Sequence, residues 1–273
     1  MVIQHNIAAI NSYRNLSTNQ SALSKNLEKL SSGYKINRAG DDAAGLAISE
    51  TMRSQINGLN QAVNNANDAI GLIQTAEGAM TETHSMLQRM KTLTTQAANG
   101  TYTQTARANI KAEIDALNKE ITRIATTTEF NGEKPLNPAK KGNLTFFIGA
   151  SAATANAMTV AQQTMTATDL KVDGIEVDNT TNAFKAMASV DAAIETVSTY
   201  RATLGAAQNR LEHTVNNLKV TSENITSAES RIRDTDMADE ITAYTKNNIL
   251  LQAAQSMLSQ SNAMPQGVLS MLQ

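Results

Sequence analysis

The sequence predicts a mainly α protein, in which long antiparallel helices form coiled-coil and bundle domains, with a small β-hairpin region in the middle of the chain. Apolar residues near both ends recur at alternating spacings of three and four, the pattern of long helices packed side by side. Aromatic residues make up only 3% of the 273 residues, which suits slender helix–helix seams. Pro135, Pro138 and Gly142 break the helical pattern in the middle. We therefore expect the N-terminal part to be helical, the chain to reverse direction in the middle, and the C-terminal part to be helical and antiparallel to the first.

Capping residues and helix breakers set the expected helix boundaries. Ser31-Ser32-Gly33 has the composition of a helix C-cap, and a connector follows over residues 34–42. Either Asp41 or Asp42 can cap the long helix after that connector. Asp234-Thr235-Asp236 separates the last two helices. The expected helices cover residues 5–32, 43–98, 104–127, 182–233 and 237–272.

The middle of the chain has the composition of a small β region. Residues 144–148 are β-like and end at Gly149. Asp173-Gly174 stands between two short apolar runs, Leu170-Lys171-Val172 and Ile175-Glu176-Val177, which predicts a hairpin there. Residues 150–169 are rich in Ala and Thr and only weakly patterned.

Composition and charge narrow the classes of function. The net charge is −2 and no long Lys/Arg block occurs, so nucleic acid is not an expected partner. The absence of Cys excludes disulfides, thiolate chemistry and Cys-ligated metal sites. No stretch approaches the roughly 18–20 apolar residues of a membrane span, and residues 1–30 lack the regions of a secretory signal. Membrane association and signal-directed export are therefore not expected.

The titratable residues do not form an expected catalytic or metal site. His5, His84 and His213 have no metal-ligand spacing, and no phosphate-binding or nucleophile motif occurs. The acidic residues after Arg233 lack the glycine and closing glutamate of a calcium loop, and Asp41-Asp42 fits capping better than acid–base work. We expect no enzymatic activity and no cofactor.

The last helical segment is apolar on more than one side. Residues 249–251, 257–258 and 268–269 are apolar runs that one neighbouring helix cannot cover completely. An exposed surface of this kind needs a partner. We expect the N-terminal helix to cover one face and neighbouring subunits to cover the rest.

Four runs of the sequence carry distinctive motifs. The first spans the connector and the start of the long helix, and the other three lie in the helical parts on either side of the middle. They are residues 30–48 (LSSGYKINRAGDDAAGLAI), 74–79 (QTAEGA), 230–238 (SRIRDTDMA) and 265–269 (PQGVL). All four resemble the corresponding motifs of bacterial flagellins. The resemblance covers about residues 1–132 and 183–273, and does not extend over the middle.

The resemblance implies a short flagellin made of two domains. Residues 1–43 with 235–273 would form an inner filament-core domain, and residues 44–234 an outer rod with a small β region near 140–180. Such a chain is a structural subunit that assembles with itself into the extracellular filament used for motility, and its terminal helices fold on assembly. It leaves the cell through the flagellar type III export apparatus, helped by an export chaperone, without a cleaved signal peptide. The filament cap and hook-junction proteins are further expected partners.

The apolar seams supply the residues expected to carry assembly. Gly33, Asp41 and Asp42 belong to the connector between the two implied domains. The expected core-assembly residues are Leu16, Leu23, Leu27, Leu30, Leu250, Leu251, Met257, Leu258, Val268, Leu269 and Leu272.

A second surface is implied by the resemblance alone. Many flagellins are ligands of a host Toll-like receptor and of cytosolic sensors, and Gln88, Arg89, Leu93 and Glu113 match positions of the receptor motif. Lys91-Thr92 and Thr94-Thr95 depart from that motif, so the resemblance does not fix the strength of signalling. The alternative is that this face makes contacts along the filament.

Three other classes remain to be distinguished. A hook–filament junction protein would share the terminal helices. A flagellin with an inserted protease would need a metal-binding motif between residues 132 and 182, where no His occurs. A free coiled-coil binding module would not form filaments when purified.

Overall fold

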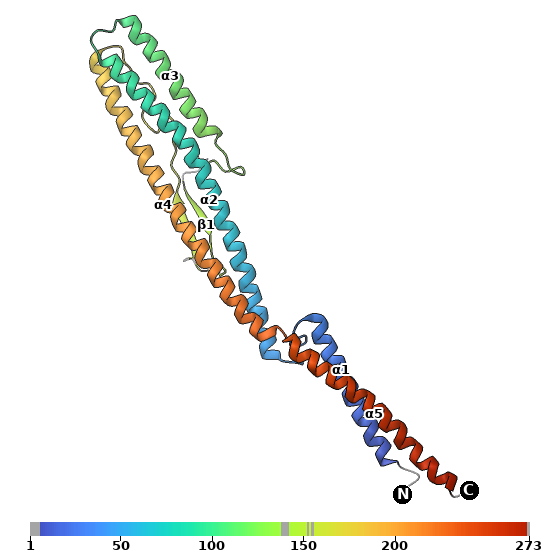
Figure 1. Cartoon of the computed structure of the whole chain (residues 1–273). Helices are drawn as coiled ribbons and strands as arrows, with labels where there is room; N and C mark the ends of the chain where they lie inside the picture. The colour runs from blue at the N-terminus through green and yellow to red at the C-terminus, as the bar shows by residue number, and fades with distance from the viewer. Residues whose placement is uncertain (1–5, 138–141, 152, 154–155, 272–273) are drawn as a thin grey trace. The chain divides into compact units, whose positions relative to one another are not determined.

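The structure is a computed structural model that describes residues 6–137, 142–151, 153 and 156–271. It is mainly α, as predicted, with one two-stranded antiparallel sheet (Figure 1). The elements are α1 (Ile7–Ser32), α2 (Ala43–Ala98), α3 (Gln104–Thr127), β1 (Asn143–Phe147), β2 (Ala157–Ala161), α4 (Thr180–Arg233) and α5 (Met237–Met271). The chain divides into a terminal unit, residues 1–55 with 223–273, and a middle unit, residues 56–222.

The predicted helix boundaries agree with the structure to within two residues, and the caps explain them; residues 5 and 272, where the first helix is expected to begin and the last to end, lie outside the described residues. Gly33 ends α1 with φ of 75°, and its N–H donates to the Lys29 carbonyl at 2.8 Å. Asp42 Oδ1 accepts the Gly45 N–H at 2.9 Å at the start of α2. Asp236 Oδ1 accepts the Ala238 N–H at 2.9 Å at the start of α5, so this acidic segment caps a helix.

The hairpin forms in a different place from the one predicted. β1 pairs with β2, with Phe146 opposite Met158. The prediction for residues 170–177 is wrong, because Lys171 and Gly174 have φ values of 58° and 70°, which extended strands do not adopt. The apolar residues of this segment are buried instead as a loop: Leu170, Val172, Ile175 and Val177.

The middle unit has a continuous apolar core. Its residues come from α2, α3 and α4, from the strands and from the loop after β2. Along α4 the buried residues recur at spacings of three and four, as the sequence predicted for this helix. Along α2, Ala62 and Ala69 are buried while the neighbouring Val63 and Ile70 are only partly buried.

None of the helices in the described residues combines the length and the apolar character that crossing a bilayer requires.

Candidate functional site

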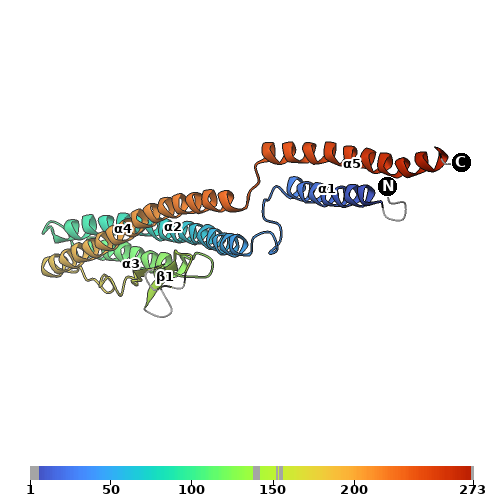
Figure 2. The same ribbon diagram turned by 90° about the horizontal axis from the view of Figure 1, so that it is seen from below.

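The terminal unit is built on the antiparallel pairing of α1 and α5, which run side by side in Figures 1 and 2. The Asn6 side-chain amide donates to the Ser261 carbonyl at 2.8 Å near the start of α1. Near the other end, Lys29 Nζ lies 3.7 Å from Glu240 Oε2. Cα atoms of the two helices come within 8 Å of each other, so the backbones approach closely.

The seam between α1 and α5 is unusually polar for a helix pair. Shielded residues recur at spacings of three and four on both helices, the geometry of a coiled coil. Asn26 and Ser261 are its two buried residues, at 8% and 7% exposure. On α1 the seam residues are Ala9, Ser12, Leu16, Asn19, Leu23, Asn26 and Leu30. On α5 they are Glu240, Tyr244, Asn247, Leu251, Ala254, Leu258 and Ser261.

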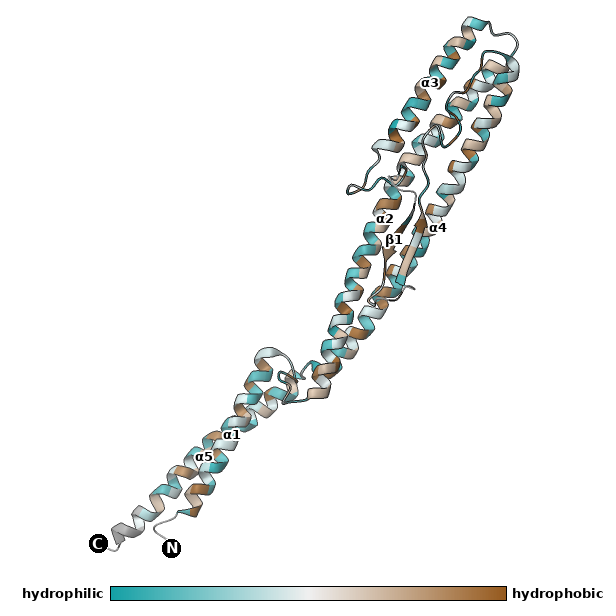
Figure 3. Cartoon of the chain, turned by 180° about the vertical axis from the view of Figure 1, so that it is seen from behind, coloured by the Kyte–Doolittle hydropathy of each residue, from teal (hydrophilic) through white to brown (hydrophobic). Residues whose placement is uncertain are grey.

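Many large apolar side chains of this pair point outward. Within the described part of the terminal unit, Ile36 is the only buried apolar residue. Large apolar residues exposed on α1 are Ile7, Ile10, Tyr13 and Leu27, and on α5 they are Met237, Ile241, Ile249, Leu250, Met257 and Met264. Figure 3 shows apolar positions along both helices. An apolar surface of this extent on a small unit marks an interaction face.

The predicted assembly residues fall into two groups. Five lie in the seam and are half-buried: Leu16, Leu23, Leu30, Leu251 and Leu258. Three others point outward: Leu27, Leu250 and Met257. Val268 and Leu269 belong to α5, and their side chains, like the whole of Leu272, lie outside the described residues. Sequence reasoning missed the seam residues Asn19 and Asn26, although their spacing from the leucines places them on one line.

The connector between α1 and α2 pairs with the segment between α4 and α5. The Lys35 N–H donates to the Arg233 carbonyl at 2.7 Å, and the Thr235 N–H donates to the Gly33 carbonyl at 3.0 Å. Asp41 Oδ2 accepts the N–H groups of Asn37 and Arg38 at 3.3 and 3.1 Å. The Arg38 and Asn37 hydrogen bonds lower the pKa of the Asp41 carboxyl, because they favour its ionised form.

Tyr34 is the centre of a charged cluster at this junction. The Arg233 guanidinium lies 4.6 Å and that of Arg53 5.8 Å from the centroid of its ring. Arg233 pairs with Glu50 at 2.8 Å, and Arg53 pairs with Glu229 at 3.3 Å. The cluster joins the connector to the start of α2 and the end of α4.

The second predicted surface lies on α2 and α3. Arg89 Nε donates to Glu113 Oε1 at 2.8 Å, and both side chains are about half-exposed. Gln88 is exposed beside them and bonds the His84 ring at 2.9 Å. Leu93 is only 2% exposed and belongs to the core of the middle unit. The structure therefore brings three of the four predicted residues to one surface.

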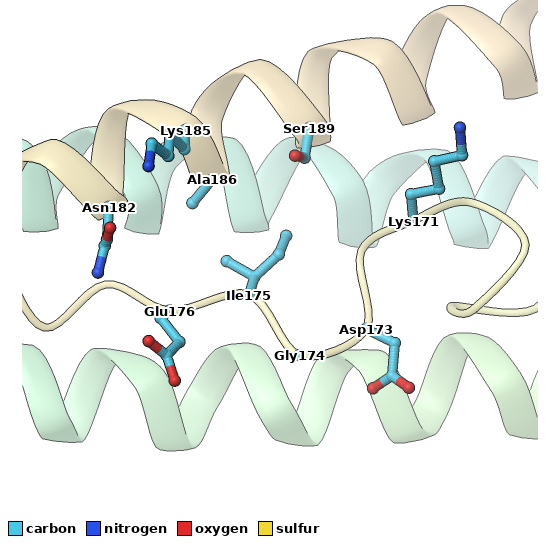
Figure 4. Close-up of a pocket in the computed structure, with 9 residues that line it drawn as sticks. All are labelled: Lys171, Asp173, Gly174, Ile175, Glu176, Asn182, Lys185, Ala186 and Ser189. Atoms are coloured by element: carbon cyan, nitrogen blue, oxygen red, sulfur yellow. The ribbon is translucent and has the colours of Figure 1, made fainter.

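Charged residues line a pocket beside the start of α4. This pocket of about 330 Å³ lies between the loop after β2 and the first turns of α4 (Figure 4). The amines of Lys171 and Lys185 point apart in this view, and the carboxylates of Asp173 and Glu176 point away from both. Among the described residues, no group of three or more His, Cys, Asp or Glu could hold a metal ion. The pocket is lined by Lys171, Asp173, Gly174, Ile175, Glu176, Asn182, Lys185, Ala186 and Ser189.

Comparison with known proteins gives the family. The bacterial flagellin N-terminal helical region matches residues 3–141, and the C-terminal helical region matches residues 187–272. The chain is 50% identical over 303 residues to the flagellin of Bacillus subtilis (strain 168), and 44% identical over 285 residues to flagellin FlaB2 of Treponema pallidum (strain Nichols). Both alignments cover 100% of each chain. A crystal structure of Bacillus cereus flagellin matches 61% of this chain and 94% of its own, with 30% identity and a TM-score of 0.49. The chain therefore belongs to the bacterial flagellins, which are structural subunits of the flagellar filament and not enzymes.

Proposed function

We propose that the chain assembles with copies of itself into the extracellular flagellar filament through the outward faces of α1 and α5, and that these helices complete their folding on assembly. The observation that carries this proposal is the distribution of apolar side chains in the terminal unit. The leucines of the α1–α5 seam are only half-buried, and the described parts of the two helices leave ten large apolar residues exposed on their outward faces.

The energetics favour folding that is coupled to assembly. Ordering each residue costs about 1–2 kcal/mol, and the polar seam offers little apolar burial to offset that cost in a single chain. Covering one outward side chain, such as Ile249 or Met257, contributes about 1.5–3 kcal/mol when a neighbour supplies the other wall. The helices are therefore marginal alone and stable in the lattice. Subunits joined head to tail make contacts that do not close, so they build an open helix.

Seeded polymerisation of the purified chain tests this proposal. Negative-stain electron microscopy would detect filaments, and circular dichroism before and after assembly would measure the gain in helix. We expect long filaments and a helix gain from the intact chain, and neither from a variant lacking residues 235–273. An intact chain that stays monomeric and fully helical under all seeding conditions would refute it.

The domain division and the remaining partners follow from this role. We propose that residues 1–43 with 235–273 form the inner filament core and residues 44–234 the outer rod, with Gly33, Asp41 and Asp42 in the connector. The connector supports this proposal, since it caps the start of α2 and forms hydrogen bonds with the segment between α4 and α5, where the two proposed domains meet in the sequence. Export through the type III apparatus with a chaperone, and contacts with the filament cap and hook-junction proteins, belong to the same proposal.

A second proposed role is recognition of the Arg89–Glu113 surface by a host Toll-like receptor; recognition of the terminal helices by cytosolic sensors is proposed with it. Gln88, Arg89 and Glu113 form an exposed polar patch from two helices, whereas Leu93 is buried in the core. A charge swap, Arg89→Glu with Glu113→Arg, keeps an ion pair while reversing the charges that a partner meets. Loss of receptor signalling with intact filaments would support the receptor role. Loss of filaments would support a contact along the filament, and no change in either would refute both.

A further inference from the structure

The buried polar contacts of the α1–α5 seam are concentrated around one residue, Asn26. With its amide oriented so that both atoms find partners, Nδ2 donates to the Ala22 carbonyl at 2.9 Å and to Glu240 Oε1 at 3.2 Å. Its Oδ1 accepts the Tyr244 N–H at 3.1 Å and Asn247 Nδ2 at 3.2 Å. Asn26 is the only buried residue of α1, at 8% exposure.

Lys29 extends these contacts by one helical turn. It lies 3.7 Å from Glu240, whose side chain is only 13% exposed. Asn26 and Lys29 thus meet the same carboxylate from two successive turns of α1. We call Asn26, Lys29, Glu240 and Asn247 the Asn26 network.

We infer that the Asn26 network fixes the register of α1 against α5, and so sets which outward residues each subunit presents to its neighbours. The inference rests on the proposed assembly function. Apolar side chains alone would not set this register, because half-buried leucines recur every seven residues at Leu16, Leu23 and Leu30. One buried Asn in a coiled-coil seam specifies register at a cost in stability, since a slipped pair leaves its amide without partners.

A slip of one heptad shows the penalty. Moving α5 by seven residues in one direction replaces Glu240, Tyr244 and Asn247 at this site by Asn247, Leu251 and Ala254. The Asn26 oxygen then loses its side-chain donor, and Lys29 loses its carboxylate. Moving α5 the other way brings the Glu240 carboxylate toward the amide oxygen, where two acceptors face each other. Either slip displaces the helices by about 10 Å, from seven residues at 1.5 Å each.

The distance between two spin labels measures the register directly. The chain has no Cys, so cysteines placed at the exposed positions Ser17 and Ala253 carry the only labels. Double electron–electron resonance on labelled subunits diluted into unlabelled filaments would give one narrow distance for the wild-type seam. We expect Asn26→Leu to add a second population at a longer distance, because a slip of about 10 Å along the helix axis moves two labels that lie opposite each other out of alignment. Glu240→Leu, which removes the partner from the other helix, should do the same.

Asn19→Leu is the matched control. Asn19 occupies the same seam and makes no hydrogen bond to α5 in the described part of the chain, so this variant should keep the single distance. Exclusion of Asn26→Leu from filaments that admit Asn19→Leu would also support the inference. One unshifted distance in both Asn26→Leu and Glu240→Leu would overturn it. If the wild-type chain forms no filaments, the assembly proposal fails. The distance between the two labels, measured on the soluble wild-type and variant chains, would then still test whether Asn26 fixes the register.

Discussion

The ring of Tyr34 lies against the guanidinium of Arg233, with 4.6 Å between the Arg233 Cζ atom and the ring centroid. Tyr34 belongs to the connector between α1 and α2, and Arg233 ends α4, 199 positions further along the chain. Glu50 Oε1 lies 2.8 Å from Nη1 of the same guanidinium, and only 12% of the Arg233 side chain is exposed. The Arg233 side chain therefore contacts both the α1–α2 connector, through Tyr34, and the start of α2, through Glu50.

Removing the Tyr34 ring should destabilise the pairing between the α1–α2 connector and the segment between α4 and α5. A cation–π contact of this kind contributes about 0.5–2 kcal/mol, so Tyr34→Ala should speed hydrogen exchange of the Lys35 and Thr235 amides by about fivefold. Tyr34→Phe keeps the ring and serves as the control. Equal exchange rates in the Phe and Ala variants would show that the ring does not stabilise this pairing.

A methyl group at Gly45 should destabilise the start of α2. An added Cβ would collide with Asp42 Oδ2 and lie 2.8 Å from Ile36 Cδ1, so we expect Gly45→Ala to lower the free energy of unfolding by about 1–3 kcal/mol. Gly78 lies in the same helix with nothing within 4 Å of such a Cβ, and Gly78→Ala should raise it by about 0.5–1 kcal/mol. Urea unfolding followed by circular dichroism measures both. A stabilised Gly45→Ala variant would contradict the packing described for this cap.

The Asp41 turn should open in acid. Because its folded pKa is lowered from 3.8, the ionised form stabilises the fold at pH values above 3.8, and this contribution is lost as the pH falls through the folded pKa. An NMR titration of the Asn37 and Arg38 amides should therefore show a midpoint below 3.8. Asp41→Asn should remove that transition. A midpoint above 3.8 would mean that these hydrogen bonds do not favour the carboxylate.

An outward residue of α5 should matter for assembly and not for the helix pair. Met257 is 63% exposed, so Met257→Gln should raise the critical concentration for polymerisation about tenfold by removing roughly 1.5 kcal/mol of burial between subunits. Ser259→Gln introduces the same residue at a polar exposed site and should leave the critical concentration unchanged. Sedimentation of filaments at a series of concentrations gives both values. Equal values for the two variants would place Met257 outside the assembly contact.

The helices could be predicted from the sequence because their ends carry strong local signals. Gly33 and Asp42 act within a few residues of the boundaries they set, so no knowledge of the tertiary structure is needed. The hairpin depended on longer-range packing. The apolar residues near Asp173 and Gly174 have a strand-like pattern, but the core of the middle unit draws them in as a loop, and β1 pairs with β2 instead.

The assembly surface could be predicted only in part, for a physical reason. A repeat of apolar residues shows that a helix needs a partner, but not whether that partner is in the same chain. Leu23 faces α5 and Leu27 faces outward, although both belong to the same apolar repeat. The apolar repeats do not identify Asn26 as a seam residue, because a search for such repeats ignores polar residues at the same spacing. Leu93 carried a motif match, but its place on α2 directs it into the core.

The helix pair also separates two kinds of constraint on the terminal segments. A seam residue such as Asn26 contacts its own chain, whereas an outward residue such as Ile249 would contact other subunits under the proposed assembly. Two flagellins with different seam residues would then copolymerise only where both seams hold the same register and the outward residues match. A cell that carries several flagellin genes could therefore vary the seam residues outside the Asn26 network, while the network and the outward residues decide which products share a filament.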